Sequence, residues 1–401
     1  MRNYWTFGSA GELMFGPGTV AHLGRAVTRR GWKRVLVVTD QNLVRAGVAQ
    51  RIVESLDRTG CMVAAFHGGQ AEPTLAVADA AREAARESTP DAILGLGGGS
   101  NLDLAKFTAL LHTHGGVPSD YFGFDRVPGP VTPVIGVPTT SGTGSEVSHA
   151  TVLTDTVQGI KVSTLSPYLR PALAIVDPDL TASCPPRAAA DAGIDALTHA
   201  IEAYTATDYR ELAIPPEEAA PYSGRMPLTD CLAEKAIELI GRHLVDAVCG
   251  ARSPEAREGM SLAATLAGLA FSNAAVAVVH ALEYPLGAAV HCSHGAGNGL
   301  LLPHVMRFNL PARTRELARV AALLGVDTAG LADGEAALAG IARVEAINRA
   351  IGIPARLRDL GATREQLPAL AEKAAAIRRL MLLNPRSASR EDLLRLYETA
   401  Y

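Results

Sequence analysis

The chain has few cysteines, no cluster of basic residues and no long apolar run. Its five scattered cysteines form no C-x-x-C pair, which argues against disulfides and against a cysteine-based zinc site. The net charge of −4 and the lack of any Lys/Arg block exclude a basic surface for nucleic acid. No signal-peptide pattern opens the chain and no stretch has the apolar length of a membrane span. We therefore expect a cytoplasmic protein without a membrane anchor.

The two halves of the chain differ in the pattern of their apolar residues. Up to about residue 180, short apolar runs alternate with amphipathic stretches, which indicates a parallel sheet covered by helices on both faces. Expected strands lie at 34–40, 62–67, 91–100, 131–140 and 171–180, and expected helices at 44–60, 74–88 and 101–114. Beyond Pro185 and Pro186 the spacing is helical, over 187–205, 229–250, 255–281, 313–324 and 336–351. We predict an α/β nucleotide-binding domain at 1–184 and an all-helical metal-binding and substrate domain at 185–401, with a polar loop at 205–229.

A glycine cluster, GLGGGSNLDLAK, follows an expected strand and opens an expected helix. Glycines there let the backbone approach a diphosphate, and the helix N-terminus offers unpaired N–H groups and a positive dipole end. The spacing departs from the G-x-G-x-x-G fingerprint at Ser100, so the cluster alone fits a tight turn as well as a phosphate site.

Two further segments favour the nucleotide interpretation. Asp40 ends the first expected strand, where a carboxylate can accept a hydrogen bond from a ribose hydroxyl and repel a 2′-phosphate; a helix-capping aspartate is the alternative. The segment PTTSGTGSEV (138–147) supplies hydroxyls that can face a diphosphate or ribose, and an ordinary Ser/Thr loop is the alternative.

Four residues suggest a metal site. Asp195 and His199 are one helical turn apart in GIDALTHAIEAY, so their side chains share a face, and His280 and His294 follow in VVHALEYPLGAAVHCSHG. Singly, each has an ordinary explanation, such as a core histidine or a capping residue. Together, one carboxylate and three imidazoles form a ligand set for a divalent transition metal.

In this order, VVTD, GGGSNLDLAK, PTTSGTGSEV, DALTHAIEAY and HALEYPLGA…SHGAGNGLLLPHVMRFN resemble the iron-dependent (group III) alcohol dehydrogenase family over nearly the whole chain. The resemblance implies an NAD(P)-binding α/β domain, a helical metal-binding domain and an active site between them. It also implies a homodimer or higher homo-oligomer. The implied metal ligands are Asp195, His199, His280 and His294.

The same resemblance assigns the other site residues. The phosphate loop falls on Gly97, Gly98, Gly99 and Ser100, and further cofactor contacts fall on Asp103, Thr139, Thr140, Thr143 and Lys161. Asp40 favours NAD over NADP. Fe(II) is the usual metal of the family, although the same ligands suit Zn(II), Mn(II) and Co(II).

Three departures from the family pattern stand out. Tyr284 replaces a histidine that many members carry four residues after the third ligand, and Asn101 replaces a proline after GGGS. The loop at 205–229 is an insertion, and with Tyr284 it is similar to the hydroxyacid–oxoacid transhydrogenase branch. Arg210 and Arg225 in that loop are candidates to pair with a substrate carboxylate, with two solvated arginines as the alternative.

The resulting hypothesis is a metal-dependent transfer of hydride between a primary or secondary alcohol and NAD. The metal polarises the alcohol oxygen, and Tyr284 and His280 are the predicted catalytic residues. The first alternative is a transhydrogenase that exchanges hydride between a 4-hydroxybutyrate-like acid and 2-oxoglutarate. The ligand segments argue against a dehydroquinate synthase or glycerol dehydrogenase, and the complete ligand set argues against a silent or filament-forming protein.

Overall fold

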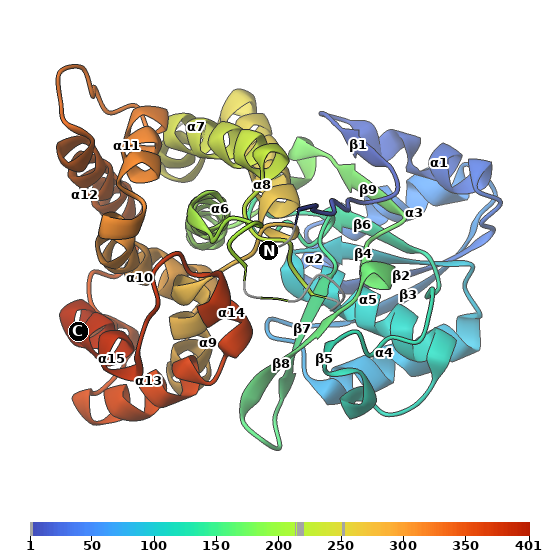
Figure 1. The fold of residues 1–401 in the computed structure, drawn as a ribbon. Helices are drawn as coiled ribbons and strands as arrows, with labels where there is room; N and C mark the ends of the chain where they lie inside the picture. The colour runs from blue at the N-terminus through green and yellow to red at the C-terminus, as the bar shows by residue number, and fades with distance from the viewer. Residues whose placement is uncertain (1–2, 213, 215–219, 251–252) are drawn as a thin grey trace. The chain divides into compact units, whose positions relative to one another are not determined.

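The computed structural model describes residues 3–212, 214, 220–250 and 253–401, and the chain divides into two compact units (Figure 1). Residues 8–184 form an α/β unit, and residues from 185 onward form a helical unit. Residues 3–7 group with the helical unit, whereas the sequence placed them in the α/β domain. A contact of 3.2 Å between Oγ1 of Thr6 and Oγ of Ser223 ties this N-terminal segment to the helical unit.

The α/β unit contains nine strands and five α-helices among its residues. The strands are β1 (Leu13–Phe15), β2 (Arg34–Asp40), β3 (Met62–Gly69), β4 (Ala92–Gly97), β5 (Gly123–Phe124), β6 (Val134–Pro138), β7 (Ala150–Asp155), β8 (Ile160–Leu165) and β9 (Leu173–Val176). The helices are α1 (Leu23–Arg29), α2 (Gln41–Arg45), α3 (Val48–Asp57), α4 (Leu75–Ser88) and α5 (Gly99–His114).

Six strands form a parallel sheet in the order β1-β9-β6-β4-β2-β3 (Figure 1). Successive side chains of a strand point to opposite faces, and both faces are apolar here. Val35 and Val37 pack with α1 and α3, while Leu36 and Val38 pack with α4 and α5. The predicted two-sided parallel sheet is confirmed.

The order of the strands creates a switch point between β2 and β4. The chain leaves β2 for β3 on one side, and then crosses to β4 on the other side of β2. In open parallel sheets, ligands bind beyond the carboxyl ends of the strands at such a point. Asp40 ends β2, Gly97 ends the adjacent β4 and Pro138 ends β6. The three segments suspected from the sequence therefore emerge from neighbouring strands at one edge of the sheet.

Several details of this unit differ from the sequence prediction, and the helix α1 and the short strands β1 and β5 were not among the expected elements. The single helix expected at 44–60 is wrong, because α2 ends at Arg45 and α3 begins at Val48. Gly47 between them has φ +72°, a left-handed conformation that glycine adopts without strain. The sequence also missed the antiparallel hairpin of β7 and β8, which joins β5 in a separate three-stranded sheet.

The helical unit is built from ten α-helices within its described residues. They are α6 (Pro186–Thr205), α7 (Pro227–Cys249), α8 (Pro254–Phe271), α9 (Val278–Val290), α10 (His294–Asn309), α11 (Thr314–Leu323), α12 (Asp333–Ile351), α13 (Leu367–Ala375), α14 (Arg378–Leu383) and α15 (Arg390–Ala400). The helix expected at 255–281 is wrong, because α8 ends at Phe271 and a separate helix, α9, carries His280. Among the described helices, none combines the length and apolar character needed to cross a membrane.

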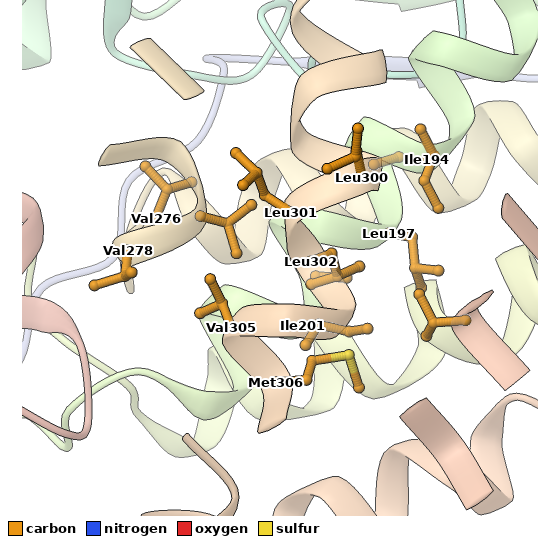
Figure 2. Close-up of a cluster of buried hydrophobic side chains, with 14 of the residues drawn as sticks. Ile194, Leu197, Ile201, Val276, Val278, Leu300, Leu301, Leu302, Val305 and Met306 are labelled. Atoms are coloured by element: carbon orange, nitrogen blue, oxygen red, sulfur yellow. The ribbon is translucent and has the colours of Figure 1, made fainter. Parts of the chain in front are cut away.

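One continuous apolar core unites these helices. Ile194, Leu197 and Ile201 lie along one face of α6 and pack toward the apolar side chains of α10 (Figure 2). Val278, at the start of α9, belongs to the same cluster, and all of these residues are almost fully buried. This packing holds α6, α9 and α10 together, the three helices that carry the predicted metal ligands.

The approach of α6 to α10 depends on a glycine. A Cβ on Gly295 would lie 1.9 Å from the backbone oxygen of Asp191, so a larger residue must push the two helices apart. We expect Gly295→Ala to lower the unfolding free energy by about 1–3 kcal/mol or more, which is typical of overpacking. Thermal unfolding of the purified variants measures the effect.

The matched control is Gly334→Ala in α12, where an added Cβ meets nothing within 4 Å. This control should be neutral or slightly stabilising, because alanine favours helix more than glycine does. Equal melting temperatures for the two variants would contradict the assigned contact.

Candidate metal centre and nucleotide site

The four suspected metal ligands come from three helices and converge on one carboxylate. Asp195 and His199 lie one turn apart on α6, His280 lies in the first turn of α9, and His294 begins α10. The Nε2 atoms of all three histidines lie 3.8 Å from Oδ1 of Asp195. Asp195, His199 and His280 are buried, and the side chain of His294 is one-third exposed. The structure thus brings together residues that are up to about one hundred positions apart.

Asp195, His280 and His294 form the tightest part of this cluster. Their ligand atoms all lie within 4.8 Å of one another. His199 is not part of that mutual set, but its ring stacks on His280 with centroids 4.8 Å apart and on Phe271 with centroids 4.2 Å apart. Typical metal–ligand distances of about 2.0–2.2 Å separate the ligands of a four-coordinate ion by about 3.4 Å. Separations of 3.8 Å therefore fit a divalent ion after a small contraction.

Two buried glutamates orient the imidazole rings. Oε2 of Glu202 lies 2.6 Å from Nδ1 of His280, and its Oε1 accepts a 2.7 Å hydrogen bond from the backbone N–H of Val279. Glu283 makes the corresponding contact with Nδ1 of His294. A carboxylate at Nδ1 holds the proton there, so that the lone pair of Nε2 faces the cluster. Sequence reasoning missed both glutamates, although each lies three residues after a predicted ligand, on the same helical face.

Asn298 is a further residue that the sequence analysis did not identify. Its Nδ2 donates to Oδ1 of Asp195 at 2.8 Å, and lies 3.1 Å from Nε2 of both His280 and His294. Asn298 is fully buried and follows His294 by one helical turn. The amide is therefore in direct contact with the predicted ligand atoms of Asp195, His280 and His294.

The environment keeps the Asp195 carboxylate ionised. Burial by itself would raise the pKa of Asp195, because a low-dielectric interior disfavours the charge. Electrostatic interaction with His199, His294 and His280, together with the Asn298 hydrogen bond, outweighs burial and lowers the pKa of Asp195 below its ordinary value. An ionised carboxylate among imidazoles is the donor set that binds divalent transition metals.

Tyr284 packs directly against the ligand cluster, by which we mean the predicted metal ligands Asp195, His199, His280 and His294. Its ring stacks on His294 with centroids 5.9 Å apart and meets His280 edge-on at 6.2 Å. Burial raises the pKa of the Tyr284 hydroxyl well above its ordinary value. The packing that the sequence offered as an alternative role is thus observed, next to the ligands.

The glycine cluster forms the expected strand-to-helix turn. Gly97 has φ +144°, and a Cβ there would lie 2.2 Å from Nδ2 of Asn101, so the turn requires glycine. No side chain caps the N-terminus of the 16-residue helix α5, which begins at Gly99. Its first N–H groups and its positive dipole end suit a diphosphate. Ser100 lies in this first turn.

The threonines of the second suspected segment flank this turn. The backbone N–H of Thr139 donates to the carbonyl of Gly97 at 2.9 Å. A Cβ on Gly98 would lie 3.4 Å from Oγ1 of Thr140, and one on Gly99 would lie 2.7 Å from Cγ2 of Thr143. Glycine, threonine hydroxyl and helix N-terminus are therefore adjacent, as a diphosphate site requires.

Asp40 and Asn101 are joined across the switch point. Oδ1 of Asp40 caps α2 by accepting from the N–H groups of Asn42 and Leu43. Its Oδ2 accepts a 2.7 Å hydrogen bond from Nδ2 of Asn101, which also donates to the carbonyl of Leu96. The capping role is thus observed, and Asn101, which departs from the family pattern, fixes the orientation of the carboxylate.

Asp103 belongs to a buried network that holds the 138–147 segment. Its carboxylate accepts from Oγ of Ser145 at 2.6 Å and from the N–H of Val152 at 2.8 Å. Lys106 donates to Oγ of Ser145 and to three further oxygens of the 148–150 segment, and burial lowers its pKa to about 8. Lys161, on β8, forms a 2.9 Å ion pair with Glu72. The cofactor contacts of Asp103 and Lys161 stay predictions.

The two loop arginines have different surroundings. Arg225 donates to both carboxylate oxygens of Asp230 at 3.0 Å and to Glu316, and its guanidinium lies over the ring of Tyr204. Neither role proposed for Arg225 is therefore correct: it is a part-buried structural arginine with two carboxylate partners. Arg210 is exposed and covers the ring of Tyr209, which fits a solvated residue.

Comparison with known proteins gives matches over both units. Residues 10–178 match the protein-family model described as iron-containing alcohol dehydrogenase. Residues 218–401 match a second family model, described as Fe-containing alcohol dehydrogenase family, C-terminal. The NAD-dependent methanol dehydrogenase of Bacillus methanolicus is 34% identical over 387 residues, 96% of this chain and 97% of that protein. Long-chain-alcohol dehydrogenase 1 of Geobacillus thermodenitrificans is 38% identical over 402 residues, 98% and 97% of the two chains. A crystal structure of 1,3-propanediol oxidoreductase aligns with a TM-score of 0.93 and 34% identity over 100% of both chains.

The orienting glutamates lead to a prediction about metal affinity. Glu202→Gln keeps the shape of the side chain but removes the charge that holds the proton on Nδ1 of His280. We expect the affinity for a divalent metal to fall about 10–100-fold, the usual cost of losing such a partner. Competition with a coloured chelator measures this affinity without any assay of turnover.

The control is Glu372→Gln, on the exposed surface of α13. It changes the net charge of the protein by the same amount, so long-range electrostatics are matched. Equal metal affinity in the two variants would remove the orienting role assigned to Glu202.

Proposed function

Since the chain belongs to the iron-containing alcohol dehydrogenase family, we propose that it moves hydride between a primary or secondary alcohol and NAD with Fe(II) at the Asp195 cluster. Metal-dependent, NAD-linked oxidoreduction of alcohols and aldehydes is the activity of this family member. The finer assignment is supported by one observation above all. A single buried carboxylate oxygen stands 3.8 Å from three imidazole nitrogens on three different helices.

The residues that would hold the metal are Asp195, His199, His280 and His294. When bound, the metal supplies a Lewis acid that lowers the pKa of the alcohol, and the nicotinamide accepts the hydride. Glu202 and Glu283 keep the lone pairs of His280 and His294 directed at the cluster. Zn(II) is the alternative metal, because His and carboxylate ligands suit both ions.

The cofactor contacts follow from the edge of the parallel sheet. Gly97, Gly98, Gly99 and Ser100 would bind the diphosphate through backbone N–H groups, flanked by Thr139, Thr140 and Thr143. Asp40 would accept from the ribose and repel the 2′-phosphate of NADP, in the orientation that Asn101 imposes. Asp103 and Lys161 complete the predicted set. A homodimer or higher homo-oligomer also stays a prediction.

Metal removal and reloading test the function. We expect metal-stripped protein to be inactive and Fe(II), added anaerobically, to restore NADH formation from simple alcohols and diols. Reloading with Zn(II) in parallel identifies the preferred metal. His280→Ala should lose metal and activity together while still binding NADH, as followed by its fluorescence, because the nucleotide segments lie on other elements.

Two outcomes would redirect the proposal. Full activity in His280→Ala would contradict the ligand assignment. Consumption of 4-hydroxybutyrate only when 2-oxoglutarate is present, without free NADH, would instead favour the transhydrogenase alternative.

We propose that Tyr284 and His280 act at the reacting alcohol, Tyr284 through its hydroxyl. Tyr284→Phe keeps both ring contacts with the ligand histidines and removes only that hydroxyl. If the hydroxyl passes or orients the proton of the alcohol, kcat should fall about a hundredfold, a typical contribution of a positioned proton-transfer group. Steady-state kinetics measure kcat, and NADH affinity and metal content are measured on the same variant. A loss of kcat with unchanged NADH affinity and metal content separates the proton-transfer effect from a packing defect. An unchanged kcat would leave Tyr284 with the packing role alone.

A further inference from the structure

Among the described residues, Arg379 differs from several arginines of the helical unit, because it combines a buried Nε atom with the lack of a protein acceptor. Arg225, Arg307 and Arg319 bind carboxylates, and Arg313 binds backbone carbonyls. Within the described part of the chain, Arg379 makes no hydrogen bond or ion pair, and its Nε is buried without an acceptor. A buried, unsatisfied donor costs free energy, so its presence in a fold needs an explanation, such as a functional role or a bound acceptor.

Arg379 lies on a helix that packs against the helix of His280 and Tyr284. Arg379 is the second residue of α14, and α14 packs against α9, the helix that carries His280 and Tyr284. The positive charge of Arg379 lowers the pKa of Tyr284, against the larger effect of burial, which raises it. The guanidinium therefore lies within electrostatic reach of the Tyr284 hydroxyl, and the Tyr284 ring stacks on His294.

A substrate carboxylate that leaves water near these residues needs a donor with positive charge as its partner. The carboxylates Asp195, Glu202 and Glu283 are almost completely buried and, when ionised, have no proton to donate. A guanidinium offers two parallel N–H donors that match the two oxygens of a carboxylate. Arg225, which the sequence suggested for this task, is already occupied by Asp230 and Glu316.

We propose that Arg379 binds the carboxylate of the substrate, so that the preferred alcohol is a hydroxyacid and the preferred aldehyde its semialdehyde. This inference rests on the proposed function, because it assumes that the alcohol oxygen is bound at the Asp195 cluster. Arg379 then decides specificity, and the chemistry at the alcohol carbon is unchanged: hydride leaves for NAD and the hydroxyl proton is released.

The test compares hydroxyacids with neutral alcohols of the same length. We expect the wild-type holoenzyme to have a higher kcat/KM for one of 3-hydroxypropionate, 4-hydroxybutyrate and 5-hydroxypentanoate than for the matching propanol, butanol or pentanol. Arg379→Gln should lower kcat/KM for that acid about 10–100-fold, the usual value of a charge-assisted hydrogen bond, and lower kcat/KM for the matching neutral alcohol much less, because that alcohol has no carboxylate to bind. Arg379→Lys should restore part of the loss, because it keeps the charge without the planar pair of donors.

Arg378→Gln is the matched control, since Arg378 is the exposed neighbour of Arg379 in the same helix. It should leave the ratio of acid to alcohol activity unchanged. Equal losses on acid and neutral alcohol in Arg379→Gln, or no change in their ratio, would overturn the proposal.

A second measurement does not depend on the variants folding. Butyrate should inhibit the wild-type enzyme competitively and much more strongly than butanamide, which has nearly the same shape without the charge. Equal inhibition would overturn the role of Arg379. Failure of the proposed function itself is distinct, because the wild-type enzyme would then form no NADH from any alcohol after reloading with metal.

Discussion

The helical unit depends on one buried charge. A carboxylate removed from water is costly unless cations or donors surround it, and Asp195 is almost fully buried. Its partners come from α6 itself, from α9 and from α10, so the three helices must meet at this point. The apolar side chains of α6 and α10 provide the packing energy (Figure 2), and Gly295, next to His294, permits the close approach of these two helices.

The second layer around this charge is also ionic. Glu202 on α6 contacts Nδ1 of His280 on α9, and Glu283 on α9 contacts Nδ1 of His294 on α10. Each glutamate therefore links the helix that bears it to the next ligand in the chain. Such links keep ligand rings in one tautomer and one orientation, and the loss of one typically lowers metal affinity about 10–100-fold. Asn298 closes the arrangement from within α10.

In the α/β unit, the topology of the sheet forms the predicted nucleotide site. Parallel strands end at one edge, and the reversal of strand order between β2 and β4 opens that edge to a ligand. Asp40 and Gly97 end two adjacent strands, and Thr139 follows the next strand. Asn101 and the Thr139–Gly97 hydrogen bond connect these residues. Here the backbone supplies most of the binding groups, so small residues and hydroxyls dominate, whereas charged side chains dominate in the helical unit.

The sequence by itself determined the two kinds of pattern, alternating strand and helix and then helix alone, and the glycine turn, because these features depend on local periodicity and spacing. The four metal ligands were predicted from their residue types and from the family resemblance. The ligand pair on α6 is visible as a one-turn interval, and the strand-to-helix turn is visible as glycine after an apolar run. Only the tertiary structure decided which carboxylates orient His280 and His294, that Arg225 is already paired, and that Arg379 stands near Tyr284. The physical reason is that partners of charged groups come from other helices, and helix packing, rather than sequence spacing, sets those distances.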